Sequence, residues 1–290
     1  MARSPQIAIV GAGNLAAALA TALHNAGCRI SEISFRQGGN SGRRAKIIAR
    51  GAGARAVPLN NARFDADVVW VCVPDRAIAT CAEQLANSRN DWNGKIVFHS
   101  SGALPASELE KLKKAGAAIA AVHPLMTFVR RSQPGLAGVP FAIQGDGSAM
   151  RSAASIVRKL GGLPFSSAAG KKPLYHTWGA FLSPLFVSLL ILAEEVGKDA
   201  GISRKAVRSN ALPILRQTLD NYARYGAAEA FSGPLVRGDV ETVSRHLDVL
   251  QTLPAARNAY LALAEAALQL LPVKDLAKIK KLINAAKTGK

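Results

Sequence analysis

In the first part of the chain, short apolar runs alternate with longer stretches in which apolar and polar residues mix. The apolar runs are nearly continuous, which is typical of strands buried on both faces of a parallel sheet. The mixed stretches between them predict covering helices, so the pattern indicates an α/β sheet domain. We expect strands at 7–10, 30–35, 68–73, 95–100, 118–122, 141–144 and 163–166, with helices at 104–115 and 150–160 among them.

From about residue 171 onward the strand pattern is lost and helical periodicity continues to the end of the chain. Pro184 and Pro213 should kink or interrupt two of the helices. We therefore expect two domains: a sheet domain at 1–170 and an all-α domain at 171–290, with a substrate in the cleft between them. The expected helices are 174–199, 204–225, 240–253, 255–271 and 274–287.

The first strand runs into the turn Gly-Ala-Gly-Asn-Leu-Ala and then into an alanine-rich helix. In this dinucleotide-binding pattern Gly11 permits a tight turn, Gly13 leaves room for a pyrophosphate, and Ala16 lets the helix lie close to the sheet. We expect Asn14 to be the N-cap, and the N–H groups of the first helical turn, including that of Leu15, to face the phosphates. The pattern predicts a doubly wound, mostly parallel Rossmann domain.

The nucleotide is predicted from the end of the second strand. An NAD-binding protein places Asp or Glu there, on the ribose 2′-hydroxyl, whereas this chain has Arg36. Ser41, Arg43 and Arg44 follow, so three guanidinium groups and a hydroxyl are available for a 2′-phosphate. We expect NADP, the alternative being a solvated basic loop.

Polar residues follow the later strands, and ligands of such sheets bind beyond the carboxyl ends of the strands. Ser101 is a candidate substrate contact, and His123 is the candidate general acid/base because a histidine titrates near neutral pH. The alternatives are that His123 only caps its own loop and that Asp75 only caps the helix that follows it. The expected cofactor contacts at these strand ends are Val73, Pro74, Asp75 and Ser100.

Two further clusters lie in the helical half. His176 begins its first long helix, and Arg237 could clamp a carboxylate or phosphate, with Asp239 orienting it or capping the next helix. His123, His176 and His246 with Asp239 could in principle bind a metal, but their spacing matches no metal-binding motif, so we expect no metal.

Composition narrows the choice of partners. The formal charge is +18, but outside 36–50 and the Lys-rich C-terminus the cations are scattered, and aromatic residues make up only 6%, so we expect no nucleic acid. Three cysteines without metal spacing, and no charged-then-apolar leader, favour the reducing cytoplasm. We interpret the uncharged run 177–193 as a buried helix rather than a membrane span. Its apolar residues cover more than one face, which favours a homodimer.

The chain resembles the bacterial Rossmann-like family known as DUF2520 in its motifs GAGNLA, VCVPD, HSSGAL, HPLMTF and SGPLVRGD. Members of that family are described as NADP oxidoreductases with no agreed substrate. More distantly it is similar to pyrroline-carboxylate reductases, 6-phosphogluconate and β-hydroxyacid dehydrogenases, and prephenate dehydrogenases. Ser101 and His123 loosely match a serine and a His-Pro of the last group. The Lys-x-x-x-Asn pair of the β-hydroxyacid dehydrogenases is absent, since Tyr175, His176 and Thr177 stand in that region.

These observations predict an NADP(H)-dependent oxidoreductase acting on a small, anionic carbonyl, imine or alcohol. In that hypothesis His123 moves the proton, and His176 or Arg237 positions the substrate. The alternatives are a non-catalytic NADP(H)-sensing protein and a deazaflavin-dependent NADP reductase.

Overall fold

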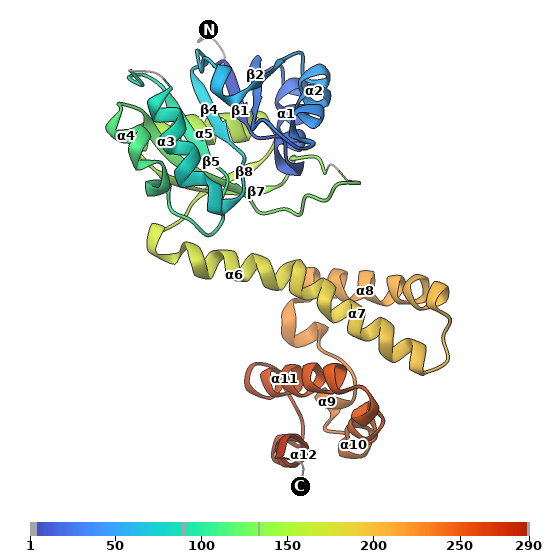
Figure 1. Ribbon diagram of the computed structural model, residues 1–290. Helices are drawn as coiled ribbons and strands as arrows, with labels where there is room; N and C mark the ends of the chain where they lie inside the picture. The colour runs from blue at the N-terminus through green and yellow to red at the C-terminus, as the bar shows by residue number, and fades with distance from the viewer. Residues whose placement is uncertain (1–4, 89–90, 133, 289–290) are drawn as a thin grey trace. The chain divides into compact units, whose positions relative to one another are not determined.

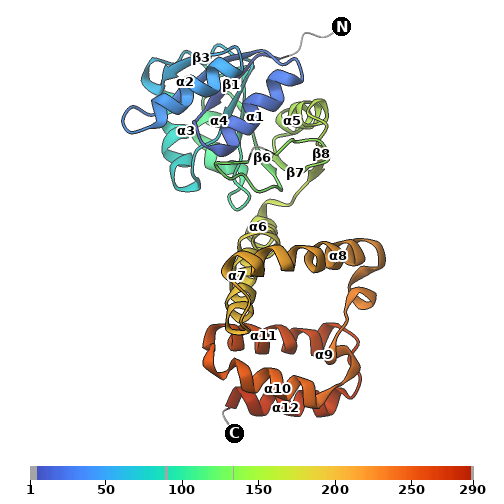
Figure 2. The ribbon, with the colours of Figure 1, turned by 90° about the vertical axis from the view of Figure 1, so that its right-hand side faces the viewer.

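The structure is a computed structural model that describes residues 5–88, 91–132 and 134–288. The chain divides into two compact units, Met1–Phe181 and Leu182–Lys290, which are described in turn. The first unit contains the whole sheet and the second contains helices only (Figures 1 and 2).

The first unit is built on an eight-stranded sheet with the order β3-β2-β1-β4-β5-β6-β7-β8. Only the pairing of β6 with β7 is antiparallel. The expected α/β class and mostly parallel sheet are therefore confirmed. The strands are β1 (Ile7–Val10), β2 (Ile30–Phe35), β3 (Arg55–Pro58), β4 (Val68–Val71), β5 (Ile96–His99), β6 (Ala118–Pro124), β7 (Pro140–Gly145) and β8 (Leu163–Ser166).

Helices cover both faces of the sheet. Alternate residues of β1 enter two different core clusters, with Ile7 and Ile9 in one and Ala8 and Val10 in the other. The first cluster is completed by α1 (Asn14–Asn25), α2 (Ser41–Gly51) and α5 (Gly147–Lys159), and the second by α3 (Ile78–Asn87) and α4 (Glu110–Lys114). The sheet is thus doubly wound, and its strands are apolar throughout because both faces are buried.

The second unit has a smaller core of its own. Side chains from α10 (Val240–Val249), α11 (Pro254–Leu270) and α12 (Leu276–Thr288) make up that core: Val243, Leu247, Leu261, Ala264, Ile279 and Ile283. The remaining helices of this unit are α7 (Pro184–Asp199), α8 (Arg204–Ala230) and α9 (Pro234–Arg237).

Several helix boundaries differ from the expected ones. The stretch expected to be one helix at 174–199 is two, because α6 (Lys172–Leu182) ends before Ser183 and Pro184 begins α7, which confirms the predicted interruption. In α8, however, the helix continues past Pro213, and the non-helical residue is Gly226. Its φ of 79° is one that a residue without Cβ adopts readily. In place of a helix at 104–115, a 3₁₀ turn at Ala106–Leu109 precedes α4.

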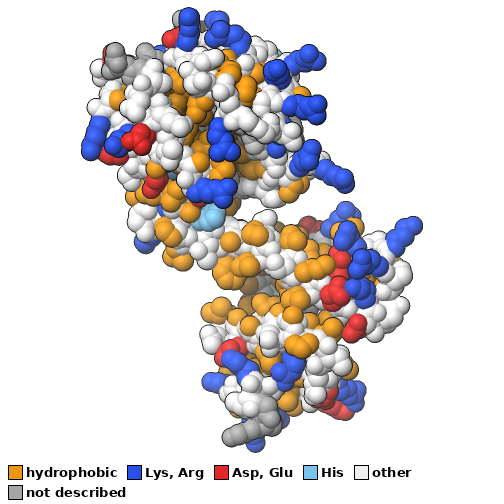
Figure 3. Space-filling model, viewed as in Figure 1, with side chains coloured by type: hydrophobic (Ala, Val, Ile, Leu, Met, Phe, Trp, Pro, Cys, Tyr) orange, Lys and Arg blue, Asp and Glu red, His pale blue; other side chains and the backbone are white. Residues whose placement is uncertain are grey.

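The expectation of a buried helix at 177–193 is wrong for the chain taken alone. No residue of α7 is buried, and in α8 only Val207 is. Apolar side chains lie on several faces of α7, whereas α8 and α11 pack against only part of it. Much apolar surface therefore stays exposed along α7 (Figure 3).

Among the described residues, one stretch, Ala169–Asp199, is long and apolar enough to cross a membrane by length and composition alone. A single stretch of this kind is weak evidence for a membrane span. It also includes the break between α6 and α7 at Ser183.

Candidate functional site

The two glycines of the first turn differ in their surroundings. Gly11 has a φ of 114°, and a Cβ there would lie 2.4 Å from the carbonyl oxygen of Cys72. Its N–H donates to the carbonyl of Ser34 over 2.8 Å. A Cβ on Gly13 would meet nothing within 4 Å. Gly11 is therefore required by the backbone, while Gly13 faces open space of the kind that a pyrophosphate needs.

Asn14 does not cap α1. The helix begins at Asn14 itself, and Gly13 occupies the N-cap position. The Asn14 amide instead bridges two other segments: its Oδ1 accepts from Nη2 of Arg44 over 2.8 Å, and its Nδ2 donates to the carbonyl of Phe128 over 3.1 Å. The side chain of Leu15 packs against the core, so only its backbone N–H remains available to a phosphate.

A cavity of about 520 Å³ lies at the carboxyl ends of β1, β2 and β4. This is the place where the strand order reverses, and ligands of doubly wound sheets bind at such a point. Seven of the expected cofactor contacts line it: Gly11, Gly13, Arg36, Ser41, Arg44, Val73 and Pro74. Four of the others, Asn14, Leu15, Asp75 and Ser100, are not among the residues that line it.

The cations around this cavity differ in part from those expected. Arg36 and Arg44 line it, whereas Arg43 lies in a separate surface hollow with Lys46, Ile47 and Arg50. The reason is helical geometry, since consecutive residues of α2 point about 100° apart. Arg76, in the turn that follows β4, also lines the cavity, and its place among the residues beyond a strand end was the signal that the sequence offered for it.

The hydroxyls of Ser100 and Ser101 both form hydrogen bonds within the protein. The hydroxyl of Ser100 accepts from Nε1 of Trp70 over 2.8 Å. The buried hydroxyl of Ser101 donates to Oδ2 of Asp75 over 2.9 Å and accepts the N–H of Leu104 over 2.9 Å. Asp75 thus holds Ser101 rather than capping a helix.

His99 at the end of β5 is fully buried. Its Nδ1 accepts the N–H of Ser101 over 3.1 Å, and its Nε2 lies 3.0 Å from the carbonyl of Pro105. The neutral tautomer with hydrogen on Nε2 satisfies both contacts. A second proton would set an N–H of the ring against the N–H of Ser101. Burial lowers the pKa of His99 to about 4.

His123 lies near the end of β6, against α6. Its Nδ1 is 2.9 Å from the hydroxyl of Tyr175, and its ring centroid is 6.2 Å from that of His176. A Cβ on Gly102 would lie 2.8 Å from Nε2 of His123 and 2.8 Å from Cδ2 of His176, so only glycine lets both rings come this close. Burial lowers the pKa of His123 to about 4, and burial raises the pKa of Tyr175 to about 12.

Beside these residues lies one charged group that was not predicted from the sequence. Lys172, the first residue of α6, is fully buried, and its Nζ donates to the carbonyl of Ser101 over 3.1 Å. In the sequence it is one of two adjacent lysines and resembles a solvated pair. The signal that could have found it is its spacing from Tyr175 and His176, because positions three and four apart share a helix face.

The candidate residues of the second unit are also placed. Asp239 caps α10 by accepting the N–H of Thr242 over 3.0 Å, which was one of its two expected roles. Arg237 is exposed. Nδ1 of His246 lies 3.2 Å from the hydroxyl of Tyr260. A role of Arg237 toward the substrate stays a prediction.

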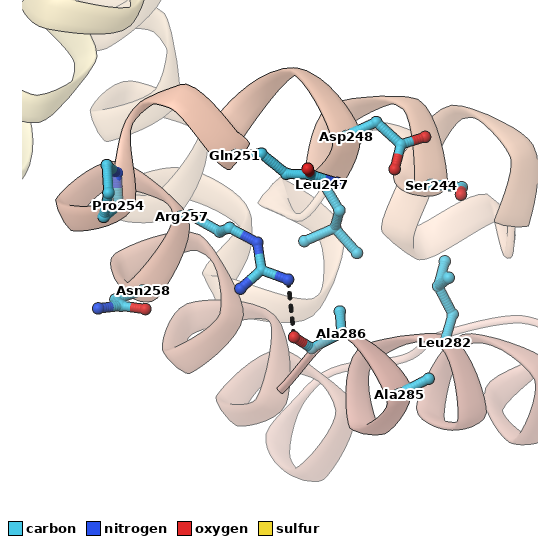
Figure 4. Close-up of a pocket in the computed structure, with 10 residues that line it drawn as sticks. All are labelled: Ser244, Leu247, Asp248, Gln251, Pro254, Arg257, Asn258, Leu282, Ala285 and Ala286. Carbon is cyan, nitrogen blue, oxygen red and sulfur yellow. Dashed lines mark hydrogen bonds between the residues drawn. The ribbon is translucent and has the colours of Figure 1, made fainter. Parts of the chain in front are cut away.

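A cavity of about 570 Å³ lies among α10, α11 and α12 (Figure 4). Arg257 crosses it and donates from Nη2 to the carbonyl of Ala286 over 2.7 Å, near the end of α12. None of its lining residues is a histidine, cysteine or glycine.

A doubly wound sheet, with a glycine turn and arginines at its switch point, defines a Rossmann-like type of domain. The comparisons agree with this class. Residues 2–124 match the model of the Rossmann-like domain, and residues 139–267 match that of DUF2520, a domain of unknown function. The chain thus carries both domains. No curated protein matches it.

Solved structures with a similar fold cover almost the whole chain. A Bacteroides fragilis protein provisionally named an NADP oxidoreductase is 21% identical, with a TM-score of 0.75 over 91% of this chain and 97% of its own. An imine reductase from a Pseudomonas species is 20% identical, with a TM-score of 0.65 over 97% and 100%. A reductive aminase from Aspergillus terreus, in complex with NADPH, is 16% identical, with a TM-score of 0.65 over 96% and 99%. At these identities the likeness shows a shared fold.

The two glycines should respond differently to substitution. Gly11→Ala should lower the free energy of unfolding by about 1–3 kcal/mol, because it adds a Cβ at a positive φ against a backbone carbonyl. Gly13→Ala should change it by less than about 1 kcal/mol but weaken nucleotide binding. Urea denaturation and NADPH titration of both variants test this. Equal destabilisation by the two substitutions would contradict it.

Proposed function

We propose that the protein is an NADP(H)-dependent oxidoreductase that acts on a small carbonyl, imine or alcohol, anionic as the sequence suggests. One observation carries the proposal. The glycine turn with its arginine-lined cavity and the uncharged His123 lie at the carboxyl ends of parallel strands, and so at the same edge of the sheet. A nucleotide in this cavity would therefore share that edge with a proton-transfer group, which a reductase requires.

The residues present fit an NADP cofactor. The space beside Gly13 and the N–H groups that begin α1 suit a pyrophosphate. Arg36 and Arg44 suit a 2′-phosphate, and Val73 and Pro74 lie farther along the same cavity wall. A bound nicotinamide would supply or accept the hydride.

The chain itself would supply the proton transfer. His123 is uncharged at neutral pH, so its imidazole can accept a proton from a substrate hydroxyl in the oxidation direction and return it in the reduction direction. The hydroxyl of Tyr175, with its raised pKa, stays neutral, and its oxygen can accept the hydrogen of Nδ1, which leaves the lone pair of Nε2 free to take the proton. Asp75 and Ser101 would order the neighbouring segment.

A second function, NADP(H) sensing without turnover, is favoured by a different observation. The hydroxyls of Ser100 and Ser101 and both nitrogens of His99 already have partners inside the protein. A site with few free polar groups can bind a nucleotide without reacting. Measured turnover on any substrate decides between the two functions.

A homodimer belongs to the same proposal. Within the second unit many exposed apolar side chains lie along α7 and α8, and a second copy of the chain presents the same kind of surface, which a two-fold interface requires. Those that are more than two-fifths accessible at the end of α6 and along α7 and α8 are Leu182, Leu185, Val187, Ile191, Leu212, Ile214, Leu219, Tyr222 and Tyr225.

Arg36 and Arg43 provide a matched pair for the cofactor. Loss of one charged hydrogen bond of about 1.5–3 kcal/mol should make Arg36→Ala bind NADPH roughly ten- to over a hundredfold more weakly, with little change for NADH. Arg43→Ala, outside the cavity, should bind both as the unaltered protein does. Fluorescence titration measures this. An unaltered protein that binds NADH as tightly as NADPH, or neither, would overturn the assignment.

His123→Ala should lower the turnover number by about 10²–10⁴ while NADPH affinity stays intact, because the ring moves a proton and does not hold the nucleotide. The measurement is NADPH oxidation with a panel of oxo acids, semialdehydes and cyclic imines. His24→Ala, at the far end of α1, serves as the control and should leave turnover unchanged. Undiminished turnover in His123→Ala would remove His123 from the mechanism.

The dimer is tested by the mass in solution. Light scattering after size exclusion should give about twice the 30.4 kDa of one chain. Val187→Glu, at an exposed position of α7, should give the single-chain mass by placing a charge in an apolar interface. A monomeric unaltered protein, or one recovered only with lipid vesicles, would count against the dimer.

A further inference from the structure

The proposed proton transfer does not use Lys172, although this side chain lies close to the other residues of the site. Lysine is almost never fully buried unless it is paired, yet this one has no exposed surface. Its neighbour Lys171 is exposed. An ammonium held inside the protein is costly, so its position calls for a physical explanation.

One face of α6 carries three groups toward His123. Lys172, Tyr175 and His176 occupy positions i, i+3 and i+4 of the helix, which lie side by side. The hydroxyl of Tyr175 contacts Nδ1 of His123, and the ring of His176 meets that of His123 edge to face. Lys172 is one turn away on the same face.

Ser101 connects this face to the rest of the site. Its carbonyl accepts from Nζ of Lys172, its hydroxyl donates to Asp75, and its N–H donates to His99. The contact with Lys172 therefore fixes the segment that begins after β5 to the first turn of α6. Both ends of that contact are buried.

The charges near His123 come from several elements. Lys172 and His176 face it from α6, and His99 faces it from β5. Burial disfavours the imidazolium form of His123 most strongly, and each of these three groups adds a smaller effect in the same direction. Asp75 acts on Lys172, where it partly offsets the burial that lowers the pKa of the ammonium to about 8. At neutral pH the site thus holds a charged lysine beside an uncharged histidine.

We propose that Lys172 is a positioning residue that fixes the Ser101 segment to α6 and whose charge adds to burial in disfavouring the imidazolium form of His123. Because Lys172 has no exposed surface, we assign it a positioning role and no contact with the substrate. In this arrangement His123 stays available as a proton acceptor well below neutral pH. Its consequence for catalysis rests on the proposed function, whereas the protonation of His123 can be measured without any substrate.

The test is an NMR titration of the full-length protein labelled on histidine, with His123→Ala used to assign the signal. Lys172→Met should raise the pKa of His123 by about one unit or more, because a like charge is removed. Lys172→Arg, which keeps the charge, should leave that pKa within about half a unit of the unaltered value. Lys171→Met is the control for a lost surface lysine and should not move it. A folded Lys172→Met variant with an unmoved His123 pKa would overturn the proposal.

A second measurement needs no variant. In the unaltered protein the His123 ring signals should show a further inflection near pH 8, where Lys172 loses its proton. Should Lys172→Met fail to fold, the absence of that inflection would refute the proposal.

The two proposals fail in distinguishable ways. If the titrations agree and no substrate is turned over, the oxidoreductase assignment fails while the role of Lys172 stands. If a substrate is found, the acid limb of kcat/KM should move to higher pH in Lys172→Met and stay in place in Lys172→Arg. A purely structural lysine would lower the rate at every pH without moving that limb.

Discussion

The row of backbone hydrogen bonds across β1, β4, β5 and β6 is the constraint on which the site depends. Its register aligns Val10 with Val71, Val71 with His99, and His99 with Ala121. Because the strands are parallel, the chain leaves all of them at the same edge. The glycine turn, the Ser100–Ser101 segment and His123 are neighbours for this reason, although they lie far apart in the sequence. A shift of one strand by a single residue would turn these side chains to the opposite face of the sheet.

Much of the first unit follows from local pattern. Doubly buried strands are apolar throughout, and Gly11 must adopt a backbone conformation that few other residues tolerate, so both were visible in the sequence. The direction in which each side chain of a helix points was not visible in the sequence. Whether Arg43 or Arg44 faces the cavity depends on where α2 begins, and Asn14 missed the N-cap by one position for the same reason. Lys172 was hidden because burial of a charge is decided by tertiary contacts and leaves no mark in composition.

The helical unit shows a different limit of prediction from the sequence. An apolar run predicts that a helix is covered, but it does not say by what. For α7 the covering surface is not supplied by α8 and α11 alone. The charge balance gives a similar lesson, since the chain has a formal net charge of +18 while the surroundings of His123 favour an uncharged ring. Local burial, rather than overall charge, sets the protonation of such a site.

Under the proposed function, Asn14 has a consequence for any attempt to re-engineer coenzyme preference. Its amide joins Arg44, a guanidinium that lines the cavity beside Gly11 and Gly13, to the backbone of the segment after β6 at Phe128. Exchanging Arg44 for an acidic residue, the obvious route toward NADH, would also remove the donor that orients this amide. The coenzyme selectivity and the order of the segment at Phe128 therefore cannot be changed independently. A successful exchange would have to supply a new partner for Asn14 along with a new contact for the ribose.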